Sequence, residues 1–150
     1  TAEEAIVSLE LGADLLQGGL GSNFLEGDDG NDRLEGNRGR AILFGGAGMD
    51  VLLADQDEDV LFGGIYRYSG DVDAVTGLMA EWSRRDLIYA ARVQRLMTGQ
   101  GQAANFALSL ENLIDDLARD QLQGKQHSDL YFLGLDDDAD ENNNETSIDL

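Results

Sequence analysis

Aspartate residues recur at regular intervals in the first half of the chain, and they are its main candidates for chemistry. Asp14, Asp32 and Asp50 are spaced 18 residues apart, and Asp59 follows nine residues later. Glycines lie shortly before the first three, so backbone carbonyl oxygens near these carboxylates are unobstructed. Calcium takes six to eight hard oxygen ligands at about 2.3–2.6 Å, more than one short turn supplies. The spacing therefore predicts divalent cation sites between stacked turns.

A nine-residue repeat underlies this spacing. From Leu9 the blocks read LELGADLLQ, GGLGSNFLE, GDDGNDRLE, GNRGRAILF, GGAGMDVLL and ADQDEDVLF. The eighth place is leucine in every block, which predicts a short strand with one inward side chain after a six-residue turn. A flexible linker rich in glycine and aspartate is the alternative, but it gives no reason for leucine at every ninth position.

These blocks resemble the RTX nonapeptide, G-G-x-G-x-D-x-U-x, from Leu9 to Gly64. The resemblance implies a mainly β fold, a parallel β-roll, which is a right-handed β-solenoid with two strands per 18-residue coil. It also implies calcium ions (Ca2+) as the cofactor. We further expect an α-helical hairpin insertion to interrupt the roll.

Two strands per coil place successive turns on opposite edges of the roll. The first edge then carries Asp14, Asp32 and Asp50. We expect two calcium ions on this edge, one between each adjacent pair of turns. The resemblance implies that each ion also takes backbone carbonyls, near Leu9, Leu11, Asp28 and Gly30 at the first site and near Gly27, Asp29, Gly46 and Gly48 at the second.

The second edge carries Asn23, Ala41 and Asp59 in the same places. Alanine offers no ligand, and a neutral amide is a weaker ligand than a carboxylate. Arg38 and Arg40 lie in the Ala41 turn, where their charge opposes a divalent ion or replaces it by pairing with a neighbouring acid. We therefore expect this edge to be empty or weak around Ala41.

The composition changes after the last block, where apolar residues recur at steps of three and four. This periodicity predicts two helices, at 73–83 and 86–98. Asp71 or Asp73 is a suitable N-cap for the first helix, and Gly99 is a suitable end for the second.

The two helices carry four of the ten basic residues, Arg84, Arg85, Arg92 and Arg95. One interpretation is a basic docking face for an anionic partner. The other, which we favour, is that the arginines pair with the acidic body of the protein. A third idea is that the insertion binds a protein partner, which an exposed apolar face around Trp82 would support and a buried Trp82 would not.

The repeat resumes in degenerate form beyond the helices. Asp115–Gln123 and Gly124–Phe132 keep the nine-residue step and carry Asp120 and Asp129 in the sixth place. We expect both to bind calcium, with Asp120 on the second edge and Asp129 on the first. The region is similar to a segment of large secreted bacterial RTX proteins in which a helical insert interrupts the ladder, and the matching residues are Ala80-Glu81-Trp82, Arg92-Val93, Leu96 and Gly99.

The last 15 residues are strongly acidic. Asp136, Asp138 and Asp140 begin like an EF-hand loop, but Glu141 and Ser147 stand where that loop needs glycine and glutamate. We expect a solvated tail, or a continuation of the ladder through Asp136 or Asp138. The expected organisation is an RTX β-roll at 1–64, a helical insertion at 65–110 with a loop entering a strand at 106–108, resumed repeats packing on the roll at 111–135, and the acidic tail at 136–150.

Composition argues against several classes of function. Thirty acidic residues against ten basic ones give a net charge of −20, which disfavours nucleic acid and anionic membranes as partners and favours cations. The chain has no cysteine, one histidine (His127) and no G-x-S-x-G motif. It has no apolar run near the ~20 residues that span a bilayer. We therefore expect neither an enzyme nor a membrane-spanning protein.

We expect a calcium-binding β-roll module of a secreted or cell-surface bacterial protein that folds on Ca2+ binding after export. The alternative is the C-terminal secretion and folding appendage of a secreted hydrolase, a protease or lipase, whose catalytic part lies outside this chain. The chain starts at Thr1 without methionine, which suggests a fragment or a processed piece. The sequence does not define the oligomeric state.

Overall fold

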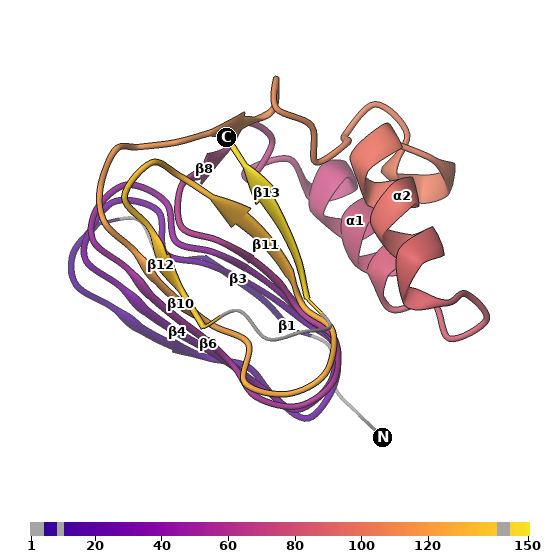
Figure 1. Ribbon diagram of the computed structural model, residues 1–150, viewed down its shortest axis with the longest axis horizontal. Coiled ribbons are helices and arrows are strands. Elements are labelled where there is room, and N and C mark those ends of the chain that lie inside the picture. The colour runs from indigo at the N-terminus through magenta and orange to yellow at the C-terminus, as the bar shows by residue number, and fades with distance from the viewer. Residues whose placement is uncertain (1–4, 9–10, 141–144) are drawn as a thin grey trace.

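The computed structural model describes residues 5–8, 11–140 and 145–150, and most of its strands lie in two parallel sheets that do not close into a barrel (Figure 1). Strands that follow one another alternate between the sheets, so each sheet gains a strand every 18 residues in the first half. The six-stranded sheet contains β1 (Ala5–Ser8), β3 (Asn23–Glu26), β5 (Ala41–Phe44), β7 (Val60–Phe62), β11 (Leu130–Leu133) and β13 (Thr146–Asp149). The five-stranded sheet contains β2 (Leu15–Gln17), β4 (Arg33–Asn37), β6 (Val51–Ala54), β10 (Gln121–Gln123) and β12 (Asp138–Ala139).

The leucines of the eighth place form the core between the two sheets. Leu16 pairs with Leu34, which pairs in turn with Leu52, so identical side chains stack in register. Leu34, Leu43 and Leu52 have no exposed surface, and burying each contributes about 1.5–3 kcal/mol. Tyr131 takes the same place in the resumed repeat and is also buried. The predicted inward leucine column is confirmed.

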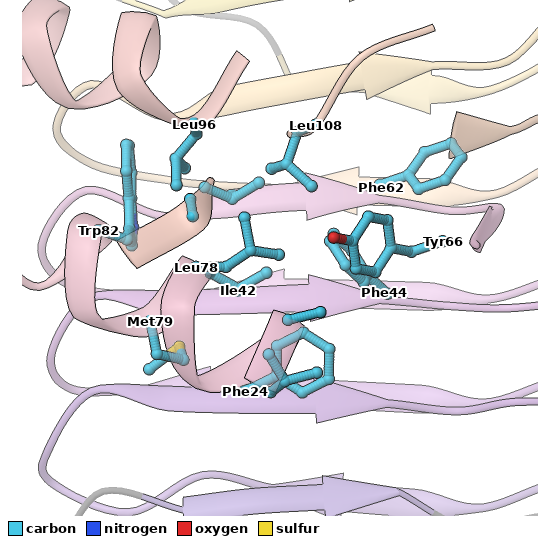
Figure 2. Packing of buried hydrophobic residues seen from close by; sticks show 14 of the residues in the cluster. Phe24, Ile42, Phe44, Phe62, Tyr66, Leu78, Met79, Trp82, Leu96 and Leu108 are labelled. Atoms are coloured by element: carbon cyan, nitrogen blue, oxygen red, sulfur yellow. The ribbon is translucent and has the colours of Figure 1, made fainter. Parts of the chain in front are cut away.

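Two helices, α1 (Val72–Trp82) and α2 (Tyr89–Thr98), lie beside the six-stranded sheet (Figure 1). They cover its outer face, which is also apolar. The side chains of Phe44 in β5 and Phe62 in β7 lie on this face, with ring centroids 6.0 Å apart. They pack in one cluster with Leu78 of α1 (Figure 2). The protein therefore has a second core, between sheet and helices.

The helix boundaries match the predicted ranges closely. The side chain of Asp71 accepts hydrogen bonds from the backbone N–H groups of Asp73 and Ala74, which makes Asp71 the N-cap of α1. Gly99 ends α2 in the left-handed conformation, with φ of 62°. The second helix begins three residues later than expected, after the extended Ile88. Within the described residues, neither helix is long and apolar enough to cross a membrane.

The ends of the insertion meet in a small antiparallel pair. β8 (Ile65–Tyr66) pairs with β9 (Leu113–Ile114), and a short 3-10 helix, η1 (Gly101–Ala103), follows α2. The predicted strand at 106–108 is wrong. The backbone N–H of Leu108 donates to the carbonyl of Leu96 at the end of α2, and its side chain is buried in the outer core.

The resumed repeat joins the stack with an edge assignment opposite to the expected one. β10 pairs with β6, which places Asp120 below Asp50 on the first edge. β11 pairs with β7, which places Asp129 below Asp59 on the second edge. The expectation was wrong because the insertion lies within a single turn. The chain leaves β7 and returns at β10, so the alternation between the two sheets continues unbroken across it.

Part of the acidic tail belongs to the stack rather than to solvent. β12 pairs with β10, and β13 pairs with β11, both in parallel. The expectation of a solvated tail is therefore wrong for 138–139 and 146–149. Residues 141–144, including Glu141, lie outside the described residues.

Candidate metal centre

The aspartates of the first edge form a continuous hydrogen-bonded ladder. The backbone N–H of Asp14 donates to Oδ1 of Asp32 at 2.7 Å, and the N–H of Asp32 donates to Oδ1 of Asp50 at 2.7 Å. The ladder crosses the insertion, because the N–H of Asp50 donates to Oδ1 of Asp120 at 2.7 Å. It ends at Asp137, whose Oδ1 accepts from the N–H of Asp120 at 3.1 Å. One oxygen of each of these lower carboxylates is thus fixed by the coil above it.

The second edge has a shorter ladder. The backbone N–H of Ala41 donates to Oδ1 of Asp59 at 2.6 Å, and the N–H of Asp59 donates to Oδ1 of Asp129 at 2.8 Å. Asn23 and Ala41 contribute no carboxylate, so the carboxylates of this edge begin with Asp59, two coils lower than Asp14 on the first edge.

The second oxygen of five ladder carboxylates has no hydrogen-bond partner although it is buried. An unpartnered buried oxygen of this kind costs about 1–3 kcal/mol, and more when it carries charge. Five such oxygens in equivalent places indicate a missing positive charge rather than random strain. They are Oδ2 of Asp32, Asp50, Asp59, Asp120 and Asp129.

On the first edge these free oxygens face backbone carbonyls across spaces kept open by glycines. A Cβ built on Gly27 would lie 2.5 Å from Oδ2 of Asp32 and 2.5 Å from the carbonyl oxygen of Gly45 in the next coil. A Cβ on Gly45 would overlap Oδ2 of Asp50 and the carbonyl oxygen of Gly63 in the same way. A carboxylate oxygen and a carbonyl oxygen that share a space repel each other unless a proton or a cation lies between them.

The corresponding space on the second edge contains a hydrogen bond instead. A Cβ on Gly18 would lie 2.7 Å from both Nδ2 of Asn23 and the carbonyl oxygen of Gly36. Here Nδ2 of Asn23 donates to that carbonyl at 3.3 Å and to the carbonyl of Gly21 at 2.6 Å. The amide of Asn23 thus supplies the hydrogen-bond donor for these carbonyl oxygens, so this position needs no metal ion.

The carbonyl positions expected around the first edge lie in the turns between coils, except for Leu9, which is outside the described residues. Leu11 bridges to Asp29, and Asp29 bridges to Ala47. The carbonyl of Asp29 accepts from the N–H of Gly12 at 3.0 Å, and that of Asp28 accepts from Ala47 at 2.7 Å. Gly30, Gly46 and Gly48 have positive φ, and a Cβ on any of them would overlap a carbonyl of the coil above.

Comparison with known families agrees with this geometry. Residues 10–43 and 36–65 match the model of the RTX calcium-binding nonapeptide repeat (4 copies). Residues 10–65 of the chain are therefore RTX calcium-binding repeats. RTX repeats bind calcium ions, and they are a structural repeat rather than a catalytic family. They are typical of secreted bacterial proteins. Comparisons with curated proteins and with solved structures found no match.

The donor set of these RTX repeats fits a calcium ion. The free carboxylate oxygens are hard ligands, and the glycines beside them leave these oxygens unobstructed. Across the described residues, no three or more His, Cys, Asp or Glu side chains gather into a metal cluster. Backbone carbonyls of the turns must therefore supply many of the ligands.

Burial raises the pKa values of the RTX carboxylates in the absence of a cation. Desolvation raises the pKa of Asp50 to about 8, and hydrogen bonding to the Asp32 backbone opposes it. Desolvation likewise raises the pKa values of Asp120 and Asp129 to about 7. The pKa of Asp59 is raised well above its usual value for the same reason. Asp116 adds to the rise at both Asp50 and Asp120 through its negative charge.

Two carboxylates of the RTX stack were not predicted to take part. Asp137 ends the first ladder in place of Asp136 or Asp138, and its Oδ2 accepts from the backbone N–H of Gly134 at 2.8 Å. Asp140 accepts from the hydroxyl of Tyr131 at 2.8 Å and from the N–H of Gly124 at 2.8 Å. The turn before β12 has four residues, 134–137, instead of six, so counting in steps of nine misses these positions.

Of the four arginines of the helices, Arg92 pairs with the acidic body as we favoured, whereas Arg84 and Arg95 pair with acidic residues of the insertion itself. Arg40 forms an ion pair with Glu58 at 3.0 Å, which places a cation beside the weak part of the second edge. Arg92 is buried, pairs with the same Glu58 and lies over the Trp82 ring, 4.7 Å from its centroid. Arg95 pairs with Glu81. Trp82 has no exposed surface, which argues against a docking surface centred on it.

Proposed function

We propose that this chain is a calcium-binding parallel β-roll module, and that its repeats fold when calcium binds. The observation that carries the proposal is the pairing of free carboxylate oxygens with carbonyl oxygens across glycine-lined spaces, as at Asp32 with Gly45 and Asp50 with Gly63. A cation is the simplest partner for both oxygens at once.

Calcium would be held on the first edge by Asp14, Asp32 and Asp50 together with backbone carbonyls of the adjoining turns. On the second edge Asp59 and Asp129 are the candidates, because Asn23 and Ala41 offer no free carboxylate oxygen. Bound there, the ion supplies the positive charge that buried carboxylates require. The residues of the chain position the oxygens, exclude water from them and keep adjacent coils in register.

Folding should depend on the ion because the coil is weak by itself. A nonapeptide such as 27–35 on the five-stranded sheet buries one leucine, worth about 1.5–3 kcal/mol, whereas ordering the backbone of each residue costs about 1–2 kcal/mol. Stacked carboxylates add repulsion. A ligand that binds only the folded state contributes RT ln(1 + [L]/Kd), which shifts the balance when calcium is abundant.

This dependence suits a protein that acts outside the cell. The low-calcium cytosol would leave the repeats open for export, and millimolar extracellular calcium would fold them. We therefore propose a secreted or cell-surface location. A role as the appendage of a secreted hydrolase depends on catalytic residues outside this chain, and no feature of the described residues favours it.

Far-UV circular dichroism of the 150-residue chain tests the proposal. In EGTA we expect a weak strand signal and a low free energy of unfolding, and on addition of millimolar calcium we expect the strand signal to strengthen. Asp32→Asn serves as the matched variant, because it keeps the oxygen that accepts from Asp14 but removes the charge, and it should require more calcium. A spectrum that calcium leaves unchanged, with no calcium bound in dialysis, would overturn the proposal.

A further inference from the structure

The insertion lies inside one turn of the first edge. In uninterrupted turns the first residue and the sixth lie together, as Gly27 does with Oδ2 of Asp32. A Cβ on Gly63 would overlap Oδ2 of Asp120 in the same way, although the two residues are 57 positions apart. Gly63 is therefore the first residue of this turn, and Asp120 is its last.

A side chain replaces a missing backbone group in the interrupted turn. In the coils above, the N–H of Gly12 donates to the carbonyl of Asp29 at 3.0 Å, and the N–H of Gly30 donates to the carbonyl of Ala47 at 2.8 Å. The equivalent N–H of Gly48 instead donates to Oδ2 of Asp116 at 2.7 Å. Asp116 thus brings a carboxylate to a place where other turns present a carbonyl.

The two parts of the interrupted turn bring further oxygens to the same layer. Asp50 and Asp120 are each 1% exposed, and Oδ2 of both has no hydrogen-bond partner. The carbonyl oxygen of Gly63 shares the space beside Gly45 with Oδ2 of Asp50. That carbonyl accepts one hydrogen bond, from Gly46 at 2.9 Å, and an oxygen of this kind has a second lone pair.

From this arrangement we infer a split calcium site in which the Asp50 carboxylate and the Gly63 carbonyl come from before the insertion and the Asp116 carboxylate comes from after it. The inference rests on the proposed function, since it assigns a further site to the same ion. It goes beyond the repeat itself, because the nonapeptide match ends at residue 65. A calcium ion here holds the two ends of the insertion together.

The site couples calcium binding to docking of the helices. The β8–β9 pair begins directly beyond Gly63 and closes just before Asp116, so an ion between these residues fixes both strands. Trp82 of α1 donates from Nε1 to the carbonyl of Glu58 at 3.0 Å and is buried. Its fluorescence therefore reports whether the helices are docked.

The test is the variant Asp116→Asn, measured by isothermal calorimetry and by Trp82 fluorescence during calcium titration of the full chain. Asparagine keeps an oxygen for Gly48 but loses the charge, so we expect one site to weaken roughly tenfold or more, since ligand charge tunes calcium affinity. The Trp82 transition should move to higher calcium with it. Asp115→Asn is the control: the Asp115 carboxylate accepts from Leu117 and Leu135 instead, so both titrations should match the wild type.

The outcomes separate this inference from the function on which it rests. If the wild type binds no calcium, the proposed function fails. If Asp32→Asn weakens binding but Asp116→Asn does not, the function stands and the split site is wrong. If Asp116→Asn moves the Trp82 signal without changing any calcium affinity, Asp116 has a structural role only, and the inference is overturned.

Discussion

The side-chain amide of Asn23 occupies the place on the second edge that the carboxylate of Asp32 occupies on the first, and only the amide bonds to the carbonyl that it faces. Nδ2 of Asn23 donates to the carbonyl of Gly36, whereas Oδ2 of Asp32 shares its space with the carbonyl of Gly45 unpaired. One atom, nitrogen in place of oxygen, thus decides whether the carbonyl oxygen in the turn receives a hydrogen bond from the chain or faces an unpaired carboxylate oxygen that can bind a cation.

Asn23→Asp should make the stability of the turn that contains residue 23 depend on calcium. In EGTA we expect the variant to lose about 1–3 kcal/mol of unfolding free energy, because the Gly36 carbonyl loses its donor and a free carboxylate oxygen is buried. Calcium should restore part or all of the loss. Urea unfolding with and without calcium measures both. Asn23→Ala removes the amide without adding charge, so its loss should be the same in both conditions.

Gly27→Ala should exclude the cation from a contiguous site of the first edge. The added methyl would lie 2.5 Å from Oδ2 of Asp32 and 2.5 Å from the carbonyl of Gly45. Because the methyl group would crowd both of these oxygens, we expect weaker calcium binding and a higher calcium concentration for folding. Gly70→Ala is the matched control, since a Cβ there meets nothing within 4 Å. Equal calorimetric titrations for the two variants would contradict the site.

The calcium-free protein should lose stability as the pH rises. Burial raises the pKa of Asp50 to about 8 and that of Asp120 to about 7, against about 3.9 in an unfolded chain. The folded state therefore holds more protons between these values. Its unfolding free energy falls by about 1.4 kcal/mol per pH unit for each such carboxyl, from about pH 4 up to its folded pKa.

Calcium should reverse this trend, because it binds the ionised carboxylates and competes with protons. Unfolding curves at pH 5, 6.5 and 8 with a chelator, and again with calcium, check the sign. Asp50→Asn should flatten the calcium-free dependence. Stability that rises with pH in the chelator would show that these carboxylates are already ionised in the folded state.

Arg92→Met should detach the helices from the second edge. The Arg92 guanidinium is 1% exposed and pairs with Glu58, and its loss should cost about 3 kcal/mol or more. We expect red-shifted Trp82 fluorescence and a lower unfolding midpoint. Arg84→Met removes an exposed pair with Asp86 and a longer one with Glu81, so it should cost less stability than Arg92→Met. A larger loss from Arg84 than from Arg92 would contradict this view of the docking.

The nine-residue period was sufficient to predict the strands, the inward leucines and the stacking of Asp14, Asp32 and Asp50. Each block of the repeat folds in the same way as its neighbours, so the register between paired strands follows from the nine-residue spacing along the chain. The helix ends were predictable for the same reason, because Asp71 and Gly99 act on the adjacent turn. The edge of Asp120 was not predictable by counting across the insertion.

The outer core shows a signal that was present in the sequence but not used. Seventh and ninth places are mostly apolar in the blocks of the covered sheet, as at Ile42, Phe44 and Phe62, with Glu26 as an exception. On the other sheet they are mixed, with Arg33 and Glu35 in one block and Val51 and Leu53 in the next. That asymmetry indicates which face the helices cover. The pairing of Arg92 with Glu58 had no comparable signal, because the two residues belong to different elements.

The sequence by itself determined the repeat, its buried leucines and the calcium chemistry of its carboxylates, because each of these depends on residues within one or two turns. Only the tertiary structure decided that the ladder crosses the insertion to Asp120 and Asp137, and that Asp116 stands in for a backbone carbonyl. These contacts join residues 17 to 70 positions apart through the pairing of strands, and spacing along the chain does not encode that pairing once the period is broken.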